Sequence, residues 1–245
     1  MPFPNINYQY WSQQNPFYQN NPIFETIRTS LTRYASRPGL INDVIERIDT
    51  LTCLELVNLI QSEIEDIVNN DLIENDVRIL RVFDLIHGWG GKTGRTPYVP
   101  YANPIRNRYE EWIHYYKMGI RLSIQGNPEG LNHFRDIDDI GTSFGSKHLS
   151  FWSRFGGNNV SIPIYDARIQ TLLYYNQNGI PTYAAYINDM VQYADNIGIT
   201  INELEMALFA FSSNYFPNST LNMRNNIEDH TDENEARNLN NLYNL

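Results

Sequence analysis

The sequence predicts an all-α fold, and three observations support this prediction. Apolar side chains recur at helical spacing along much of the chain, whereas no alternating run is long enough for a sheet and no internal repeat has solenoid spacing. The chain has 245 residues, of which 42% are hydrophobic and 19% charged. This length and composition are enough for one or two sizeable cores, so we expect an ordinary globular protein.

Three segments carry an apolar stripe that fits one face of a helix. They span Leu56 to Val68, Ile105 to Ile120 and Tyr183 to Ala194. The last of these helices should start after Pro181 and stop at Gly198, since proline favours a helix start and glycine a helix end. We expect the stripes to form the core.

Two further helices follow from other signals. The segment from Val77 to Ile86 is apolar on most sides, which predicts a helix buried between neighbours and running into a loop at His87. Thr200 and Glu203 have the spacing of a capping box and should open another helix. Its inward face would consist of Leu204, Ala207, Leu208 and Phe211.

The domain organisation follows from where these patterns end. We expect one helical domain over residues 1–221 and a polar, acidic appendage over residues 222–245, with a short amphipathic helix from Glu233 to Tyr243. Residues 1–18 lack the features of a signal peptide, and no apolar run is long enough to cross a membrane. The single cysteine, Cys53, lies in an apolar helical pattern and should be a core thiol. A cytoplasmic protein fits these features.

The net charge of −10 argues against a nucleic-acid partner, but it is unevenly distributed. Residues 42–86 contain eleven acids and three bases, whereas residues 87–121 contain six bases and two acids. The six bases are Lys92, Arg95, Arg106, Arg108, Lys117 and Arg121. On charge alone, a solvated surface of mixed sign remains the simpler interpretation.

The glycine-rich segment from Gly88 to Arg95 contains Gly-Lys-Thr but fails the full phosphate-loop pattern, because Ile86 stands where the first glycine is required. Two interpretations remain open. The segment is either a flexible cationic connection, in which Lys92 and Arg95 approach DNA, or a structural tight turn. The five histidines show no metal-ligand spacing, and no serine has a nucleophile-elbow sequence.

The segment from Asp139 to Ile169 contains the candidate catalytic residues. A Gly/Ser-rich turn should lead into a helix that begins near Ser146, which places Lys147 in the first turn. There the helix dipole favours a neutral amine, as a lysine nucleophile requires. Asp166 follows nineteen residues later, just after Pro163, and should stay ionised at the start of a second helix.

This segment resembles the helix-hairpin-helix DNA glycosylase superfamily, most closely its 8-oxoguanine DNA glycosylase branch. The run Ser143-Phe144-Gly145-Ser146-Lys147 matches the Gly-x-Gly-x-Lys turn of that family, with serine in place of the first glycine. Asp166 follows the lysine at the family's separation, and Arg168 stands where the family has a phosphate-contacting side chain. The specific match covers residues 137–175.

The resemblance implies a two-lobed helical fold with the active-site cleft between the lobes. It implies a monomer that binds double-stranded DNA, excises a damaged or modified base and cleaves the strand as a lyase. Lys147 would be the nucleophile and Asp166 would stabilise positive charge on the sugar. The phosphate contacts would come from Ser143, Gly145, Ser146 and Arg168. No metal or other cofactor is required, although the hairpin of the family binds a monovalent cation.

A glycosylase must flip the base into a pocket, which should be aromatic. The candidates are Trp89, Phe144, Trp152, Phe209 and Phe211. Three alternatives remain: a glycosylase for a hypermodified base of invading phage DNA, a catalytically silent DNA-binding module, and a helical adaptor that uses the acidic half to bind proteins.

Overall fold

A computed structural model describes residues 3–35, 40–91, 109–137, 140–157, 160–174 and 181–215. These residues form helices, with one isolated antiparallel bridge between Pro22 and Thr52 and no strand, which confirms the all-α class for the described part of the chain. The chain divides into two compact units. The large unit is Pro16–Ile164, and the small unit combines Met1–Asn15 with Tyr165–Leu245. The expected acidic appendage lies outside the described residues.

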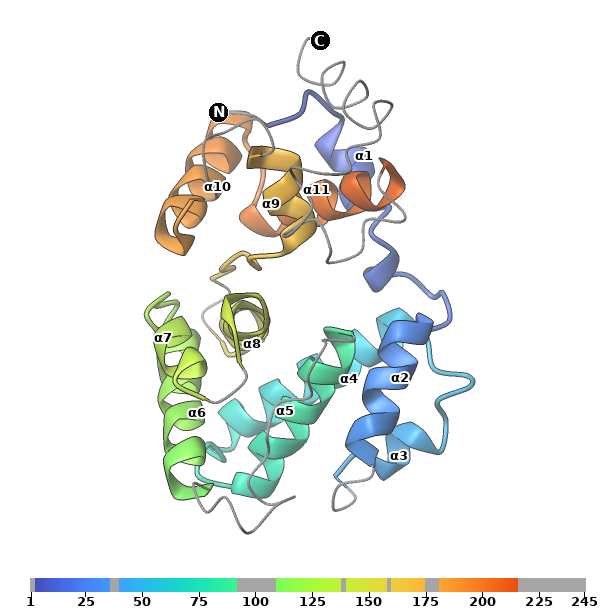
Figure 1. The fold of residues 1–245 in the computed structure, drawn as a ribbon, viewed down its shortest axis with the longest axis vertical. Helices are drawn as coiled ribbons and strands as arrows, with labels where there is room; N and C mark the ends of the chain where they lie inside the picture. The colour runs from blue at the N-terminus through green and yellow to red at the C-terminus, as the bar shows by residue number, and fades with distance from the viewer. Residues whose placement is uncertain are drawn as a thin grey trace, which may run out of the picture. The chain divides into compact units, whose positions relative to one another are not determined.

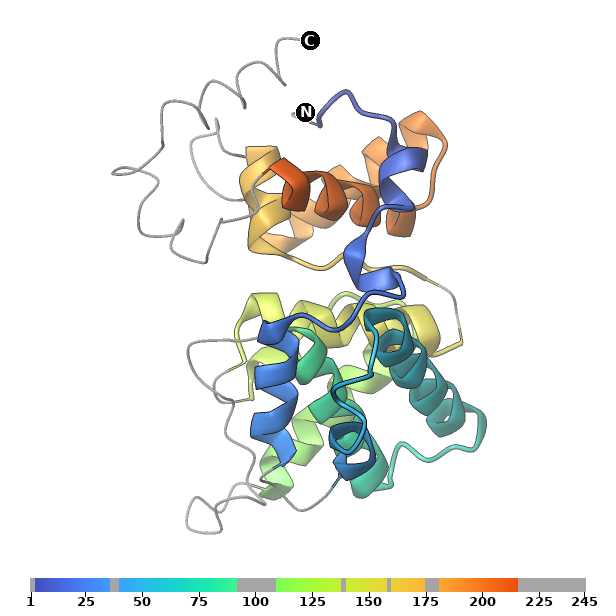
Figure 2. The same cartoon turned by 90° about the vertical axis from the view of Figure 1, so that its right-hand side faces the viewer.

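The large unit is built around one helix, α8, which contacts four others (Figures 1 and 2). Its helices are η1 (Pro16–Tyr18), α2 (Glu25–Ala35), α3 (Asn42–Ile45), α4 (Cys53–Asn69), α5 (Asp76–Trp89), α6 (Tyr109–Ile124), α7 (Gly130–Arg135) and α8 (Thr142–Phe155). Helix α8 packs against α4, α5, α6 and α7, and α5 also packs against α2 and α4. Residues on α8 are therefore held from several sides.

Most of the predicted apolar stripe of α4 is buried, with Leu59 and Val68 partly buried. A capping box formed by Thr52 and Glu55 starts this helix and satisfies backbone N–H groups that lack a helical partner. Cys53 is a buried free thiol, as expected, and burial raises its pKa. The predicted stripe at Ile105 to Ile120 corresponds to α6, whose described part begins at Tyr109.

Helix α5 is buried between neighbours as predicted, but it continues through Trp89, so the expected loop at His87 is wrong. The reason is close packing. A Cβ atom on Gly88 would lie 2.2 Å from Leu31 Cδ2, so glycine here lets α5 approach α2. Gly90 is the C-cap of the helix, and Gly91 follows with a positive φ of 77°, a conformation that favours glycine.

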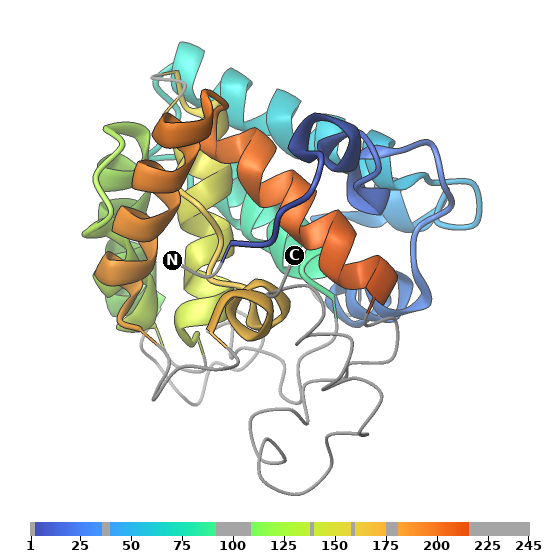
Figure 3. The ribbon, with the colours of Figure 1, turned by 90° about the horizontal axis from the view of Figure 1, so that it is seen from above.

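The small unit is built around α11, which contacts the three other helices that the structure describes in this unit and can be followed in Figure 3. These helices are α1 (Tyr8–Ser12), α9 (Ala167–Tyr174), α10 (Tyr183–Ile197) and α11 (Ile201–Tyr215). Helix α10 ends at Gly198 with a φ of 72°, as predicted. The capping box of Thr200 and Glu203 is formed, and the four residues predicted for the inward face of α11 are buried. In the described ranges, no helix is both long and apolar enough to span a membrane.

Candidate active site around Lys147

Lys147 lies in the second turn of α8, because this helix begins at Thr142 and not near Ser146 as expected. The side chain is only 7% exposed. Lysine is almost never buried to this degree at an ordinary surface position. The simple alternative of an exposed lysine at a helix start therefore does not describe this residue.

The Lys147 amino group contacts its own helix. Its Nζ donates to the carbonyl oxygen of Ser143 at 3.4 Å and to the Oγ of the same residue at 3.3 Å. It also lies 4.9 Å from the ring centroid of Phe144, which is within the range of a cation–π contact. One turn of α8 thus fixes the position of the nitrogen.

Gly90, at the end of α5, lets this helix approach the Lys147 side chain. A Cβ atom on Gly90 would lie 2.8 Å from Phe144 Cε1 and 3.0 Å from Lys147 Cδ. The backbone of Gly90 has an ordinary φ of −62°, so the space, and not the conformation, requires glycine. Sequence reasoning did not single out this residue, although its place in a Gly-Trp-Gly-Gly run is a visible signal.

The residues expected in a phosphate-binding turn lie within α8. The backbone N–H groups of Phe144 and Gly145 both donate to the carbonyl oxygen of Gly141, so they belong to the first helical turn. A Cβ atom on Gly145 would lie 2.8 Å from Leu131 Cδ1, which shows that this glycine serves the packing of α8 on α7. Ser146 is fully buried and donates to the carbonyl oxygen of Ser143.

This placement moves the start of the helix towards the N-terminus. Gly141 occupies the N-cap position, is exposed and supplies no side-chain cap. The N–H groups of Thr142 and Ser143 have no acceptor within the helix, as at every helix N-terminus. An anion would therefore meet α8 at Gly141–Ser143 and not at Gly145 or Ser146.

A buried polar network lies directly behind Lys147 and joins α5, α6 and α8. His87 Nδ1 and His148 Nε2 are 2.8 Å apart, and His148 Nδ1 lies 3.1 Å from the Tyr116 hydroxyl. Trp152 Nε1 donates to the same hydroxyl at 3.3 Å. All four side chains are at most 1% exposed. Sequence reasoning weighed these histidines only as metal ligands, and periodicity gives no signal for a pairing between distant helices.

One donor in this network is fixed by its chemistry. An indole N–H can only donate, so the Tyr116 hydroxyl accepts from Trp152, whereas the donor and acceptor roles of the imidazole nitrogens depend on their tautomers. Burial and, to a smaller extent, the charge of Lys147 lower the pKa of His148 to about 3. His148 is therefore neutral at pH 7 and adds no positive charge beside Lys147.

Asp166 and Arg168 belong to the small unit, at the start of α9. Asp166 Oδ1 accepts a hydrogen bond from the backbone N–H of Arg168 at 2.8 Å, which makes the aspartate the cap of this helix. The prediction of a carboxylate at a helix start is confirmed. Both side chains are half-buried.

The aromatic candidates for a base pocket fall into different environments. Phe144 is half-buried and contacts Lys147, whereas Trp152 is fully buried in the polar network and belongs to the core. Trp89 is 7% exposed and packs against Phe17 and Phe151. The other two candidates lie in the small unit, where they contribute to its core; they are Phe209 and Phe211.

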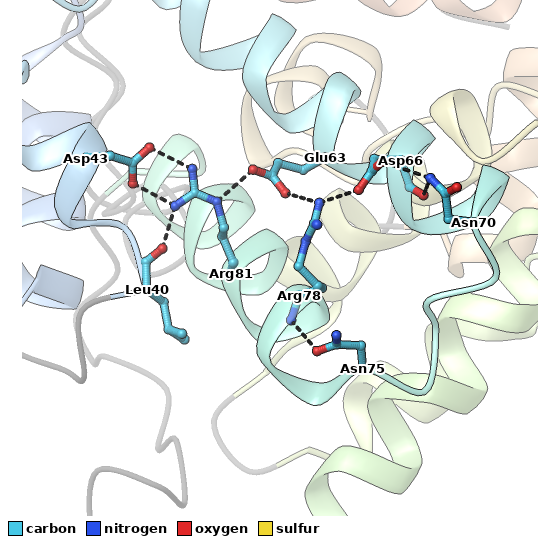
Figure 4. Close-up of polar contacts among 8 residues, drawn as sticks. All are labelled: Leu40, Asp43, Glu63, Asp66, Asn70, Asn75, Arg78 and Arg81. Atoms are coloured by element: carbon cyan, nitrogen blue, oxygen red, sulfur yellow. Dashed lines mark hydrogen bonds and ion pairs between the residues drawn. The ribbon is translucent and has the colours of Figure 1, made fainter.

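Three of the eleven acids of residues 42–86 form ion pairs with two arginines of the same segment (Figure 4). Arg81 forms ion pairs with Asp43 and Glu63, each at 2.7 Å. Arg78 pairs with the same Glu63 at 2.9 Å and with Asp66 at 2.6 Å. The network ties α3, α4 and α5 together. It raises the pKa of Arg81 and lowers the pKa of Asp43, in each case chiefly through their mutual hydrogen bonds.

The expected excess of positive charge over residues 87–121 is smaller than the sequence count indicates. Lys117 pairs with Glu74 at 2.9 Å and with Asp76 at 2.8 Å, and Arg121 also pairs with Glu74. These two bases are thus neutralised by acids near the start of α5. The other four, which include the predicted DNA contacts Lys92 and Arg95, lie outside the described residues.

The chain shows no significant match to a protein-family model, a curated protein or a solved structure. Within the described ranges, histidine, cysteine, aspartate and glutamate side chains form no group of three that could hold a metal ion. The candidate functional residues are therefore those around Lys147, together with Asp166, which caps α9.

Proposed function

We propose that the protein is a DNA glycosylase that flips a damaged or modified base out of duplex DNA, releases it and then cleaves the strand as a lyase. The proposal includes a helix-hairpin-helix glycosylase fold of two lobes, in which Lys147 and Asp166 act on the same nucleotide. The supporting observation is the burial of Lys147, which is only 7% exposed and fixed by Ser143 and Phe144. A buried, positioned lysine is typical of a nucleophile that forms a Schiff base.

The chemistry assigns one task to each residue. As the bond between C1′ and the base nitrogen breaks, its electron pair leaves with the base, which takes up a proton. Asp166 stabilises the positive charge that develops on the sugar, and the neutral amine of Lys147 forms a new bond to C1′. The amine loses a proton, and the C1′–O4′ bond then breaks as O4′ takes up a proton, which opens the sugar ring and gives a protonated Schiff base. Loss of a proton from C2′ then expels the 3′ phosphate by β-elimination.

The start of α8 supports a role in binding the DNA backbone. Gly141 is exposed, and there is open space around the position of a Cβ atom on it. The unpaired N–H groups and the helix dipole at Gly141–Ser143 favour an anion such as a phosphate. We propose that this end of α8, together with Arg168, contacts the phosphates next to the excised base. No metal or organic cofactor takes part in this scheme.

Borohydride trapping tests the proposal, because it reduces a Schiff base to a stable covalent bond. The full-length protein is incubated with duplexes that contain 8-oxoguanine, uracil, hypoxanthine or a preformed abasic site. We expect release of at least one base and a covalent complex with the abasic duplex. A protein that neither releases a base nor forms this complex is not a glycosylase of the proposed kind.

A further inference from the structure

The last turn of α5 lies against the face of α8 that carries Lys147. Gly90 closely approaches Lys147 Cδ, and the ring of the preceding residue, Trp89, meets the ring of Phe151 edge-on, with 4.8 Å between the centroids. Phe151 follows Lys147 by four residues, so both side chains lie on the same face of α8. Trp89 is therefore a neighbour of the site.

The indole N–H of Trp89 has an unusual position. The side chain is 7% exposed, and its Nε1 atom is buried without a hydrogen-bond partner in the described part of the chain. Buried donors in native proteins are nearly always paired, since an unpaired donor loses its hydrogen bond to water and gains nothing in return. Trp152 has the usual arrangement of a buried indole, in which the N–H has an acceptor, because it donates to the Tyr116 hydroxyl.

We propose that Trp89 is a specificity-determining residue of the Lys147 site, whose indole N–H donates to a carbonyl oxygen or an unprotonated ring nitrogen of the excised base. This inference rests on the proposed function and names its substrate class: bases that present such an acceptor on the edge that enters the site. Phe17, whose ring centroid lies 5.3 Å from that of Trp89, adds an aromatic surface. A base without the acceptor would leave the donor unpaired, which is a strong basis for rejection.

Trp112 offers a matched comparison. Its Nε1 atom is also buried without a partner among the described residues, but its ring packs against Phe83 and Tyr116 in the helical core. An unpaired indole N–H is thus not sufficient for a role in recognition. The neighbourhood of Lys147 distinguishes Trp89, so the same substitution at the two tryptophans should have different effects.

The experiment compares Trp89→Phe and Trp112→Phe with the wild-type protein in two reactions. The first is release of the base that the wild type excises fastest from the panel of duplexes. The second is borohydride trapping on a preformed abasic site, which contains no base. We expect Trp89→Phe to slow base release by roughly tenfold or more, as loss of a buried hydrogen bond should, while trapping changes less than about twofold. Trp112→Phe should leave both rates of the folded protein within about twofold of wild type.

Two outcomes would overturn the inference while leaving the proposed function standing. Base release by Trp89→Phe could be unchanged, or it could fall no more than trapping does. A wild-type protein that traps abasic DNA yet releases no base would leave only the lyase part of the proposed function and would overturn the inference, because there would be no base for Trp89 to select. A wild-type protein that is inactive in both reactions would instead refute the proposed function and the inference together.

Discussion

Asp166 Oδ1 accepts the backbone N–H of Arg168 at 2.8 Å, so the carboxylate proposed to stabilise the sugar cation also caps α9. The capping bond fixes the orientation of the carboxylate, and the N-terminal end of the helix favours its negative charge. One residue thus combines a structural and a proposed chemical task. Substitutions can separate the two, because capping requires an oxygen acceptor and not a charge.

Asp166→Asn should keep the cap and remove the charge, whereas Asp166→Ala should lose both. Asparagine caps a helix about as well as aspartate, so we expect the melting temperature of Asp166→Asn to stay close to wild type. Its base release should slow by roughly a hundredfold or more, because the charge on the sugar is no longer balanced. Asp166→Ala should in addition lose about 1 kcal/mol of stability. Thermal unfolding and base-release assays on the same preparations measure both effects.

Thr182→Ala is the matched control for this pair. The Thr182 side chain accepts from the backbone N–H of Ala185 and caps α10 in the same unit. Its removal should lower stability by about 1 kcal/mol and leave the reaction rates of the folded protein unchanged. If Asp166→Asn remained active, Asp166 would be a structural cap without a chemical role.

Lys147→Gln and Lys147→Arg should both abolish borohydride trapping on an abasic duplex. Glutamine removes the amine, and arginine keeps a positive charge over the Phe144 ring but supplies no nucleophile at neutral pH. Lys117→Gln serves as the control, because Lys117 is held in ion pairs with Glu74 and Asp76. Gel analysis of the trapped complex measures the outcome. Trapping by Lys147→Arg at the wild-type level would exclude Lys147 as the nucleophile.

Gly90→Ala should disturb the position of Lys147. The added methyl group would lie 2.8 Å from Phe144 Cε1 and 3.0 Å from Lys147 Cδ, so one of these side chains must move. We expect trapping to slow by roughly tenfold, because small displacements of a reacting group have large effects on rate. The free energy of unfolding should fall by about 1 kcal/mol, since the far ends of flexible side chains can adjust.

Gly88→Ala, two residues earlier on the same helix, is the control for this substitution. Its methyl group would lie 2.2 Å from Leu31 Cδ2, in the packing between α2 and α5. Stability should fall by about 1–3 kcal/mol, whereas the folded fraction should trap at the wild-type rate. Equal effects of both variants on trapping would show that Gly90 acts only through the fold.

Seven helices could be predicted from the sequence, by apolar spacing or by signals at a helix start: α4, α5, α6, α8, α9, α10 and α11. Helices α1, α2, α3 and α7 were not predicted. Two boundaries, the start of α8 and the end of α5, were predicted wrongly, and both errors have the same cause. Glycine is unfavourable inside helices, but Gly145 lies within α8 against Leu131 and Gly88 lies within α5 against Leu31. A sequence does not show whether a glycine serves a turn or close packing between two helices.

The buried network of the site could not be predicted either. His87 and His148 are 61 positions apart, and their contact depends on how α5 packs on α8, which periodicity does not specify. Lys147 and Asp166 could be identified from the sequence, because both belong to one short segment with recognisable spacing. Sequence reasoning thus identified the proposed chemical groups but not the residues that support them.

The protonation of His148 should make stability depend on pH. Burial lowers its folded-state pKa to about 3, below the value of about 6.5 in an unfolded chain. Between these values the unfolded state binds more protons, so the free energy of unfolding falls as the pH decreases, by at most about 1.4 kcal/mol per pH unit. Denaturant unfolding at pH 6.5 and pH 5 measures the slope. His148→Gln should reduce it, whereas replacing the exposed His114 by Gln should not.

DNA affinity should depend on Arg168 despite the acidic total charge. Each phosphate contact contributes to the salt dependence of binding, so Arg168→Ala should weaken binding and flatten the slope of log affinity against log salt by about one unit. The effect should be equal for damaged and undamaged duplexes, because a phosphate contact carries no base information.

A charge reversal at an acid outside the proposed site is the control. Glu63 is unsuitable, since it pairs with both Arg78 and Arg81, but Glu65 is exposed and accepts only from Gln61 in the described part of the chain. Glu65→Lys should leave the affinity for a specific duplex within about twofold of wild type. If Glu65→Lys altered the salt slope as much as Arg168→Ala does, the DNA would bind a different face of the protein.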